Sequence, residues 1–267
     1  MPSQSGTMWC GSITAVPEPS DAERLRLREA PADRPIMRQV WKHLGFLHWA
    51  VEPDVMARAL PPGLQVDTFD GAAFLGIVPF TIPVSRMAGV GLPITPGFHE
   101  LNVRTYVHRE GREPGVWFFS LDAASQLAVW GARLAYGLPY FPARISMDVT
   151  GDRDSPTIAY TSRRERSGTE ARFQARYGPM AAPFAAAPGT LEFFLVERYL
   201  LYAWRRQRLT TARVHHHPYP VQTATVADLE QTLLGAAGLP DVGGSPAYVH
   251  YAREVDVRIY RPHRVAG

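Results

Sequence analysis

Three polar side chains alternate with apolar ones along one segment of the sequence. Glu100, Asn102 and Arg104 lie two residues apart within the alternating stretch His99–His108. Since successive side chains of a β-strand point to opposite faces, this pattern predicts a strand with the three polar groups on one face. A guanidinium there could bind a carboxylate through two parallel hydrogen bonds. A carboxyl group whose pKa is raised by burial could act as a general base. The set suits a small organic anion.

Two plainer interpretations of this face stay open. A strand with one polar face often turns that face to water. Alternatively, Glu100 and Arg104 could form an ion pair that only fixes the register of the strand, because many ion pairs serve structure alone.

The amine content of the chain restricts the chemistry further. Lys42 is the single lysine among 267 residues, and it lies in a different segment from the polar strand face. Imine formation with a carbonyl compound needs a desolvated lysine amine. We expect Lys42 to be exposed or packed along its stem, so covalent imine chemistry is disfavoured. Whether the chain is an enzyme at all stays undecided.

Composition and charge exclude several classes of function. The 28 Lys and Arg residues nearly balance the 25 Asp and Glu residues, and the arginine clusters lack interleaved aromatic residues, so no nucleic acid partner is expected. Cys10 is the only cysteine, which leaves no internal disulfide or thiolate cage. In His215–His217, only the first and third side chains would share a strand face, and no acidic residue is near. We therefore predict neither a metal nor a cofactor.

The chain shows no feature of a secreted or membrane protein. The first 35 residues lack an apolar core typical of a signal sequence. The longest uncharged apolar run, Gly71–Ser85, contains two prolines and is shorter than the roughly 20 residues of a spanning helix. We expect a cytoplasmic protein with a small-molecule ligand and no membrane partner, and a homo-oligomer is left open.

The chain divides into a tail and one domain. Residues 1–35 are rich in small, polar and proline residues and predict a flexible tail, in which Asp21–Glu29 could form a helical turn or two with little to bury. Periodic order begins near Met37, which leaves both Met1 and Met37 as candidate starts. Residues 36–265 predict a single domain.

Within that domain, strands outnumber helices. Asp70-Gly71 is typical of a tight turn and predicts a hairpin of Leu64–Phe69 with Ala72–Phe80. The many strands favour an α+β fold, mainly antiparallel β, with the sheet curled on itself around an interior that could hold a small ligand. Further predicted strands are His99–His108, Val116–Asp122, Ala143–Val149, Thr157–Arg163, Ala171–Tyr177, Thr211–Val221 and Tyr248–Tyr260, and predicted helices are Pro53–Leu60, Ser125–Tyr136, Leu191–Arg206 and Val226–Ala237.

Several segments together resemble a known family. The YqjF-like family of uncharacterised proteins is similar in the order and spacing of these segments, and it is allied in fold to acetoacetate decarboxylase. The resemblance covers about Met37 to Arg261 and implies a closed, cone-like antiparallel barrel with a few flanking helices. The segments are Trp41–Trp49, Leu60–Leu64 with Asp67–Gly71, Glu100–Tyr106, Gly115–Ala123, Leu138–Tyr140, and Glu197–Tyr199 followed by Leu201–Tyr202.

The resemblance also implies where the chain departs from decarboxylase chemistry. Glu100 matches the position of an active-site glutamate in the wider superfamily. The segment Gly137–Phe141 resembles its Gly-Phe-Pro-Lys-Lys motif, but Tyr140 and Phe141 replace both lysines. The chain is therefore not expected to be a functional acetoacetate decarboxylase. Tyr140 could instead polarise a carbonyl oxygen of the ligand.

These observations predict a barrel-interior pocket for an oxo or hydroxy carboxylate that works without a Schiff-base lysine. If the chain is an enzyme, lyase-like or acid–base chemistry fits. The alternatives are a non-catalytic protein that binds a hydrophobic metabolite through Trp117, Phe118, Phe119, Tyr140 and Phe141, and a structural or interaction module. The candidate catalytic residues are Glu100 and Tyr140, and the candidate ligand-binding residues are Arg104, Asn102, Asp122, His48 and Trp117.

Overall fold

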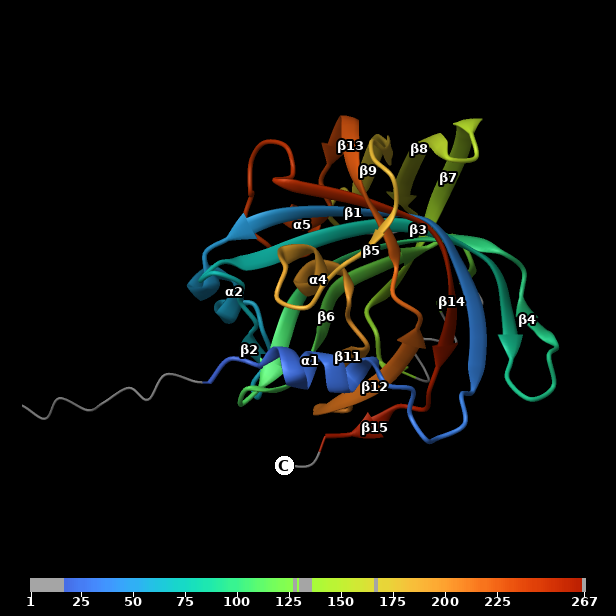
Figure 1. The fold of residues 1–267 in the computed structure, drawn as a ribbon. Helices are drawn as coiled ribbons and strands as arrows, with labels where there is room; N and C mark the ends of the chain where they lie inside the picture. Colours follow the sequence, from blue (N-terminus) through green and yellow to red (C-terminus); the bar gives the residue numbers. More distant parts are fainter. Residues whose placement is uncertain (1–16, 127–128, 130–135, 166–167, 266–267) are drawn as a thin grey trace, which may run out of the picture.

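The protein is built mainly from long β-strands. The computed structural model describes residues 17–126, 129, 136–165 and 168–265, and the arrangement is drawn in Figure 1. The helices are α1 (Asp21–Arg28), α2 (Pro53–Arg58), α4 (Leu191–Val196) and α5 (Leu233–Ala236). The strands are β1 (Met37–Val51), β2 (Gln65–Val66), β3 (Ala73–Met87), β4 (Pro93–Thr95), β5 (Phe98–Arg109), β6 (Arg112–Ala123), β7 (Tyr140–Asp152), β8 (Ser155–Arg164), β9 (Arg172–Pro179), β10 (Phe184–Ala185), β11 (Leu200–Arg205), β12 (Arg208–His216), β13 (Pro220–Gln231), β14 (Tyr248–Ile259) and β15 (His263–Arg264).

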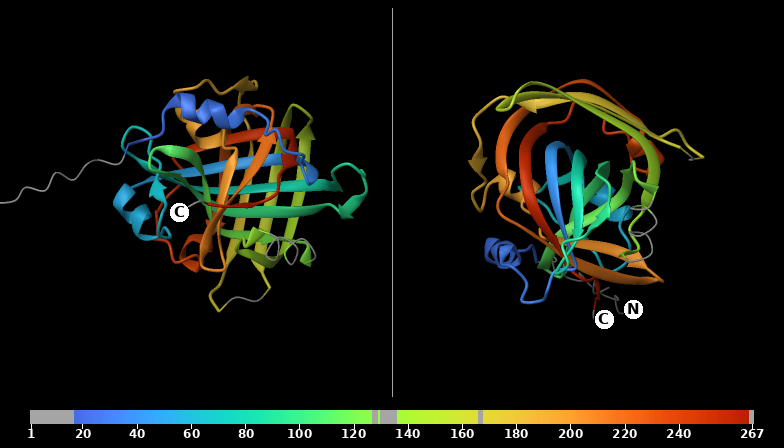
Figure 2. Two further views of the ribbon diagram at one scale, coloured as in Figure 1. Left: turned by 90° about the horizontal axis from the view of Figure 1, so that it is seen from below. Right: turned by 90° about the vertical axis from the view of Figure 1, so that its right-hand side faces the viewer.

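The strands join into closed rings, as the curved sheet in Figure 2 shows. A first ring runs β14–β1–β3–β5–β6–β11–β12 and closes where β12 pairs with β14. A second path leaves β6 through β7, β8, β9 and β13 and returns to β14. Most pairs are antiparallel, but β6 pairs in parallel with both β7 and β11, so the sheet is mixed. The expected closed, mainly antiparallel barrel is therefore confirmed. Closure leaves few free sheet edges.

Strand β5, which both rings share, is buried on both faces. On β5, Phe98 and Tyr106 belong to one apolar cluster inside the first ring, whereas Leu101 and Val103 belong to a second cluster inside the other ring. The burial of the whole strand explains why one side chain in two on β5 can be polar without facing bulk water. The polar face turns to the interior of the first ring.

A close contact between β9 and β1 crosses the second compartment. Tyr177 on β9 donates a hydrogen bond from its hydroxyl to the backbone oxygen of His43 at 2.7 Å. A Cβ atom at Gly45 would lie 2.9 Å from a carbon of the Tyr177 ring. Only glycine leaves room for the ring against β1 at this point. His43 itself has a positive φ of 54°, where the register of β1 against β3 shifts.

Most of the predicted elements are confirmed. The strands predicted at His99–His108, Val116–Asp122, Ala143–Val149, Thr157–Arg163, Ala171–Tyr177 and Tyr248–Tyr260 correspond to β5, β6, β7, β8, β9 and β14, and the helix predicted at Pro53–Leu60 corresponds to α2. The strand predicted at Thr211–Val221 divides into the end of β12 and the start of β13. The predicted helix Ser125–Tyr136 falls largely outside the described residues.

Two predicted helices are wrong. Leu191–Arg206 is helical only to Val196, and β11 then pairs with β12 through a turn in which Arg206 and Gln207 have positive φ. Val226–Ala237 is the end of β13 followed by the short α5, because β13 pairs with β9. In both cases, strand pairing overrides the helical spacing of apolar residues.

The predicted hairpin is only partly correct. Asp70 and Gly71 form the tight turn with positive φ angles, and Phe69 forms a single bridge with Ala72. Beyond this bridge, β2 pairs with β5 and not with β3. The Asp-Gly turn is confirmed, and the long pairing across it is wrong.

The expectation that the N-terminal segment has little to bury is also wrong. The predicted helical turns exist as α1, with Ser20 accepting a hydrogen bond from the backbone N–H of Glu23 as its cap. Leu27 is buried in a cluster with residues of β5 and β11, and Arg24 is buried as well. Residues from Asp21 onward therefore pack onto the first ring and are not a free tail.

Candidate functional site

A cavity of about 370 Å³ lies inside the first ring. Its size is within the range of small-molecule sites. Glu100, Asn102 and Arg104 all line it from β5, and Tyr140 lines it from the start of β7. The rest of the wall is mainly apolar, with Phe46, Val78, Phe80, Phe118, Leu121 and Val214 among its side chains. The strand face predicted from the sequence thus faces an enclosed space and not bulk water.

Glu100 and Tyr140 form a buried acid–phenol pair. The Tyr140 hydroxyl donates a hydrogen bond to Glu100 Oε2 at 2.9 Å. Burial raises the pKa of the Glu100 carboxyl to about 8, although the hydrogen bond from Tyr140 acts in the opposite direction. Burial and the neighbouring carboxyl group also raise the pKa of Tyr140 well above its usual value. Near neutral pH both groups are therefore protonated, and Glu100 can donate a proton to a ligand.

Neighbouring elements fix the position of Glu100. On β8, across the second compartment, the Tyr160 hydroxyl donates to the backbone oxygen of Glu100 at 2.8 Å. Glu100 and Arg104 make no ion pair with each other, although both are in the described part of the chain. The plain interpretation of a register-fixing Glu–Arg pair therefore does not hold.

Two arginines lie at the other end of the cavity. Arg104 donates from Nη2 to the backbone oxygen of Leu195 at 3.1 Å, and Arg198 donates from Nε to that of Phe194 at 2.7 Å. The last turn of α4 thus orients both guanidiniums, as helix C-terminal carbonyls favour cations. Within the described residues, Arg104 Nε and Arg198 Nη2 are buried and have no hydrogen-bond partner. Unpaired buried donors of this kind are suited to an anion.

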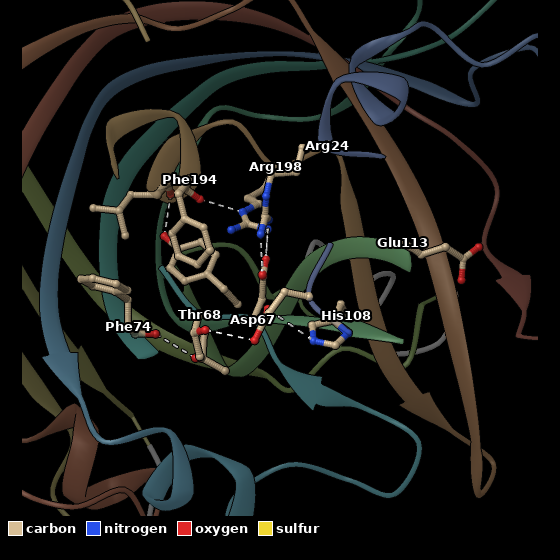
Figure 3. Close-up of polar contacts among 12 residues, drawn as sticks. Arg24, Asp67, Thr68, Phe74, His108, Glu113, Phe194 and Arg198 are labelled. Carbon is tan, nitrogen blue, oxygen red and sulfur yellow. Dashed lines mark hydrogen bonds and ion pairs between the residues drawn. The ribbon is translucent and has the colours of Figure 1, made fainter. Parts of the chain in front are cut away.

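The buried carboxylate of Asp67 forms an ion pair with Arg198, as Figure 3 shows. Asp67 Oδ2 accepts from Arg198 Nη1 at 2.6 Å, and Asp67 also takes two hydrogen bonds from Arg24 of α1, at 2.5 and 2.6 Å. Burial raises the pKa of Asp67, but the two guanidiniums outweigh it and hold the pKa below its usual value. Arg198 also lies over the ring of Phe194, 4.3 Å from its centroid.

Sequence reasoning missed Arg198, Asp67 and Arg24 as parts of this site. Arg198 and Asp67 belong to segments that carry the family resemblance, and this was the available signal. The helix that the sequence predicts at Leu191–Arg206 does not indicate that Arg198 faces the barrel interior. The tail predicted for residues 1–35 includes Arg24.

Three of the predicted ligand-binding residues do not line the cavity. His48 is fully buried, and its Nε2 is 2.6 Å from the hydroxyl of Tyr106. Burial lowers the pKa of His48 well below its usual value, so its ring is neutral. Trp117 packs in the cluster that contains Leu27 of α1. These positions place His48 and Trp117 behind the cavity wall.

Asp122, the third of these residues, belongs to the second compartment. Its Oδ1 pairs with Arg164 Nε at 2.7 Å, and both side chains are buried. Burial raises the pKa of Asp122 to about 6 against the opposing effect of Arg164. The pair connects β6 to β8, and neither residue lines the cavity.

The only lysine of the chain forms an ion pair on the surface. Lys42 Nζ lies 2.7 Å from Glu254 Oε2, and both side chains are substantially exposed. Lys42 is not part of the cavity wall. Because the chain has no other lysine, no lysine amine is placed to form an imine with a ligand in the cavity.

The histidine tract has separate environments. His216 is buried and stacks on Tyr199, with ring centroids 4.6 Å apart, while His215 and His217 have ring centroids 6.2 Å apart. Within the described ranges, no three His, Cys, Asp or Glu side chains gather where they could hold a metal ion. None of the helices in the same ranges combines the length and apolar character needed to cross a membrane.

The ring architecture and its interior cavity define the class of protein, a β-barrel of the acetoacetate decarboxylase type. The structure is similar to that of acetoacetate decarboxylase from Legionella pneumophila, with a TM-score of 0.62 over 92% of this chain and 96% of that chain, at 15% sequence identity. It is also similar to the enduracididine biosynthesis enzyme MppR complexed with pyruvate, with a TM-score of 0.59 over 89% of this chain and 93% of that chain, at 16% identity. These likenesses establish the fold.

Sequence similarity identifies the family of the chain more specifically than the fold does. Residues 38–256 match the model of the DUF2071 family, described as an uncharacterized conserved protein. The chain is 40% identical over 225 residues to the uncharacterized protein YqjF of Bacillus subtilis, covering 83% of this chain and 89% of that protein. The chain belongs to the DUF2071 family, which confirms the resemblance drawn from the sequence.

Proposed function

We propose that the first ring binds a small organic acid, an oxo or hydroxy carboxylate, and acts on it by acid–base chemistry without a covalent imine. The observation that carries the proposal is the protonated Glu100–Tyr140 pair in a ligand-sized cavity that no lysine reaches. A related fold holds pyruvate in MppR, which supports an organic acid as the ligand class.

Each polar group has a role that its protonation state permits. Arg104 and Arg198 bind the carboxylate with donors that have no other partner in the described chain. Neutral Glu100 donates a proton or hydrogen bond to a carbonyl or hydroxyl oxygen of the ligand. The Tyr140 hydroxyl donates a hydrogen bond to the other carboxyl oxygen of Glu100, Oε2. Above pH 8 or so, the deprotonated carboxylate of Glu100 becomes a base.

The proposal is tested by turnover and trapping together. Candidate oxo and hydroxy acids are incubated with the protein, and reaction is followed by mass spectrometry with and without borohydride. We expect turnover that Glu100→Gln abolishes and Lys42→Ala leaves intact, with no borohydride adduct. A stable adduct on Lys42, or loss of turnover in Lys42→Ala, would contradict the non-covalent mechanism.

A second function is favoured by the apolar majority of the cavity wall. In this alternative, the chain binds or senses a hydrophobic metabolite and performs no chemistry. Glu100→Gln and Tyr140→Phe separate the two, because a binding protein would retain ligand affinity in both variants and show no turnover in the parent. The absence of nucleic acid partners, a cytoplasmic location and homo-oligomer formation stay predictions.

A further inference from the structure

The polar groups of the cavity are divided between two ends. β3 and β5 pair in antiparallel register, with Ile82 opposite Phe98 and Phe80 opposite Glu100. Glu100 and Arg104 are four positions apart, which corresponds to about 13 Å between their Cα atoms at the rise of an extended strand. Arg104 points further from Glu100, since its guanidinium bonds to Leu195 of α4 and approaches Tyr106. The acid and the guanidiniums therefore cannot hold the same small group.

One of these ends is open and the other is closed. Met87 and Ile94 line the cavity beyond Phe98 and are 50% and 44% exposed, so the entrance lies on the Glu100 side. Arg104 and Arg198 are buried, and the last turn of α4 holds them through its carbonyls. The closed end of the cavity is cationic, and the acid–phenol pair lies between it and the entrance.

The wall between the two ends is apolar except for Asn102. Val78 and Leu121 flank Asn102 in the strand register, and Val116 and Phe118 continue the surface from β6. Asn102 Oδ1 is buried and has no hydrogen-bond partner among the described residues. A ligand that contacts both ends must therefore cross this wall with an apolar chain.

We infer that the cavity binds a medium-chain carboxylic acid with a second oxygen function, its carboxylate at Arg104 and Arg198 and its carbonyl or hydroxyl oxygen at Glu100 and Tyr140. This inference rests on the proposed function and names its substrate class. An extended carbon chain advances about 3.3 Å over roughly three bonds, so a gap of about 13 Å or slightly more, less a hydrogen-bond length of about 3 Å at each end, corresponds to about six to ten carbons. A three-carbon acid can contact only one end.

The test measures affinity against chain length by calorimetry in the unmodified protein. The probes are pyruvate, saturated acids from butanoate to dodecanoate, 8-hydroxyoctanoate and 1-octanol. Affinity should rise about fourfold per methylene up to the matching length and then fall. Octanoate should bind far more tightly than pyruvate, 8-hydroxyoctanoate more tightly still, and 1-octanol at least tenfold more weakly than octanoate.

Two variants test which functional group of the ligand binds at each end of the cavity. Arg104→Met should reduce the preference for octanoate over 1-octanol several-fold, with Arg198 left to bind the carboxylate, and Glu100→Gln should reduce the advantage of 8-hydroxyoctanoate over octanoate. Arg144→Met is the control, because that arginine is exposed on β7. The chain-length series needs no variant, so it decides the matter even where Arg104→Met does not fold.

The outcomes separate this inference from the proposed function. Pyruvate binding as tightly as octanoate would overturn the chain-length inference and leave the proposed organic-acid site standing. Equal affinity for octanoate and 1-octanol would overturn the assignment of the carboxylate end. Failure of every acid to bind, at any length, would overturn both.

Discussion

At the scale of single residues, Glu100 makes the stability of the protein depend on pH. Its pKa is about 8 in the folded chain and near 4.5 in an unfolded one. Between these values the unfolded chain has lost the proton that the folded chain keeps. The free energy of unfolding therefore falls as pH rises through this window, by up to several kcal/mol.

Glu100→Gln should remove this dependence. Urea unfolding at about pH 5, 7 and 9 measures the difference between the parent and the variant. We expect the variant to gain relative stability as pH rises, with the gain complete above about pH 8. Parallel stability curves would mean that the carboxyl is hydrated and not desolvated.

Tyr140→Phe tests the partner of that carboxyl. The hydrogen bond from Tyr140 lowers the pKa of Glu100 against the larger effect of burial, so its loss should raise that pKa further. The pH at which ligand binding or turnover changes should therefore move upward in the variant. A shift downward, or none, would show that the phenol does not donate to Glu100 in solution.

At the scale of elements, α1 is attached to the barrel by the ion pair of Arg24 with Asp67 and by the buried side chain of Leu27. Arg24→Ala should destabilise the protein by about 2 kcal/mol, because it removes two buried hydrogen bonds from Asp67 while Arg198 still neutralises the carboxylate. It should also weaken the binding of acids. Without Arg24, Asp67 loses two of the hydrogen bonds that fix its position, and it then holds Arg198 less firmly. Thermal unfolding and ligand titration measure both effects.

The matched control is Arg26→Ala on the same helix. Arg26 pairs with Glu23, and its side chain is 58% exposed. Exposed pairs of this kind contribute little to stability. Equal destabilisation by the two variants would contradict a specific role for Arg24.

At the scale of the whole molecule, the second compartment includes a close contact between β9 and β1. Gly45→Ala would force the Tyr177 ring away from the strand, since the new Cβ would lie 2.9 Å from it. We expect a loss of about 1–3 kcal/mol, as for other overpacked interiors. Gly168→Ala is the control, because a Cβ there meets nothing within 4 Å. Chemical denaturation compares the two, and equal stability would show that the ring can move without cost.

The positions of individual residues show why sequence predicted one half of the site better than the other. Glu100, Asn102 and Arg104 share a strand, where the alternation of two fixes a common face before any tertiary contact is known. Arg198 and Asp67 come from separate segments and meet only because β11 pairs with β6 and β12. The sequence could not supply this pairing, because Leu191–Arg206 has the apolar spacing of a helix and its turn at Arg206 and Gln207 lacks the usual glycine or asparagine.

The sequence by itself determined the family, the mainly antiparallel strands, the common face of Glu100 and Arg104, and the lack of an amine for imine chemistry. The order and spacing of the matching segments are sufficient for the family, and local periodicity and composition are sufficient for the other three. Only the tertiary structure decided that this face looks into a closed ring, that Asp122 and His48 lie behind the wall, and that the guanidiniums and the acid occupy opposite ends. These facts depend on which distant strands pair and on how much water the ring excludes, and neither is encoded in the spacing of neighbouring residues.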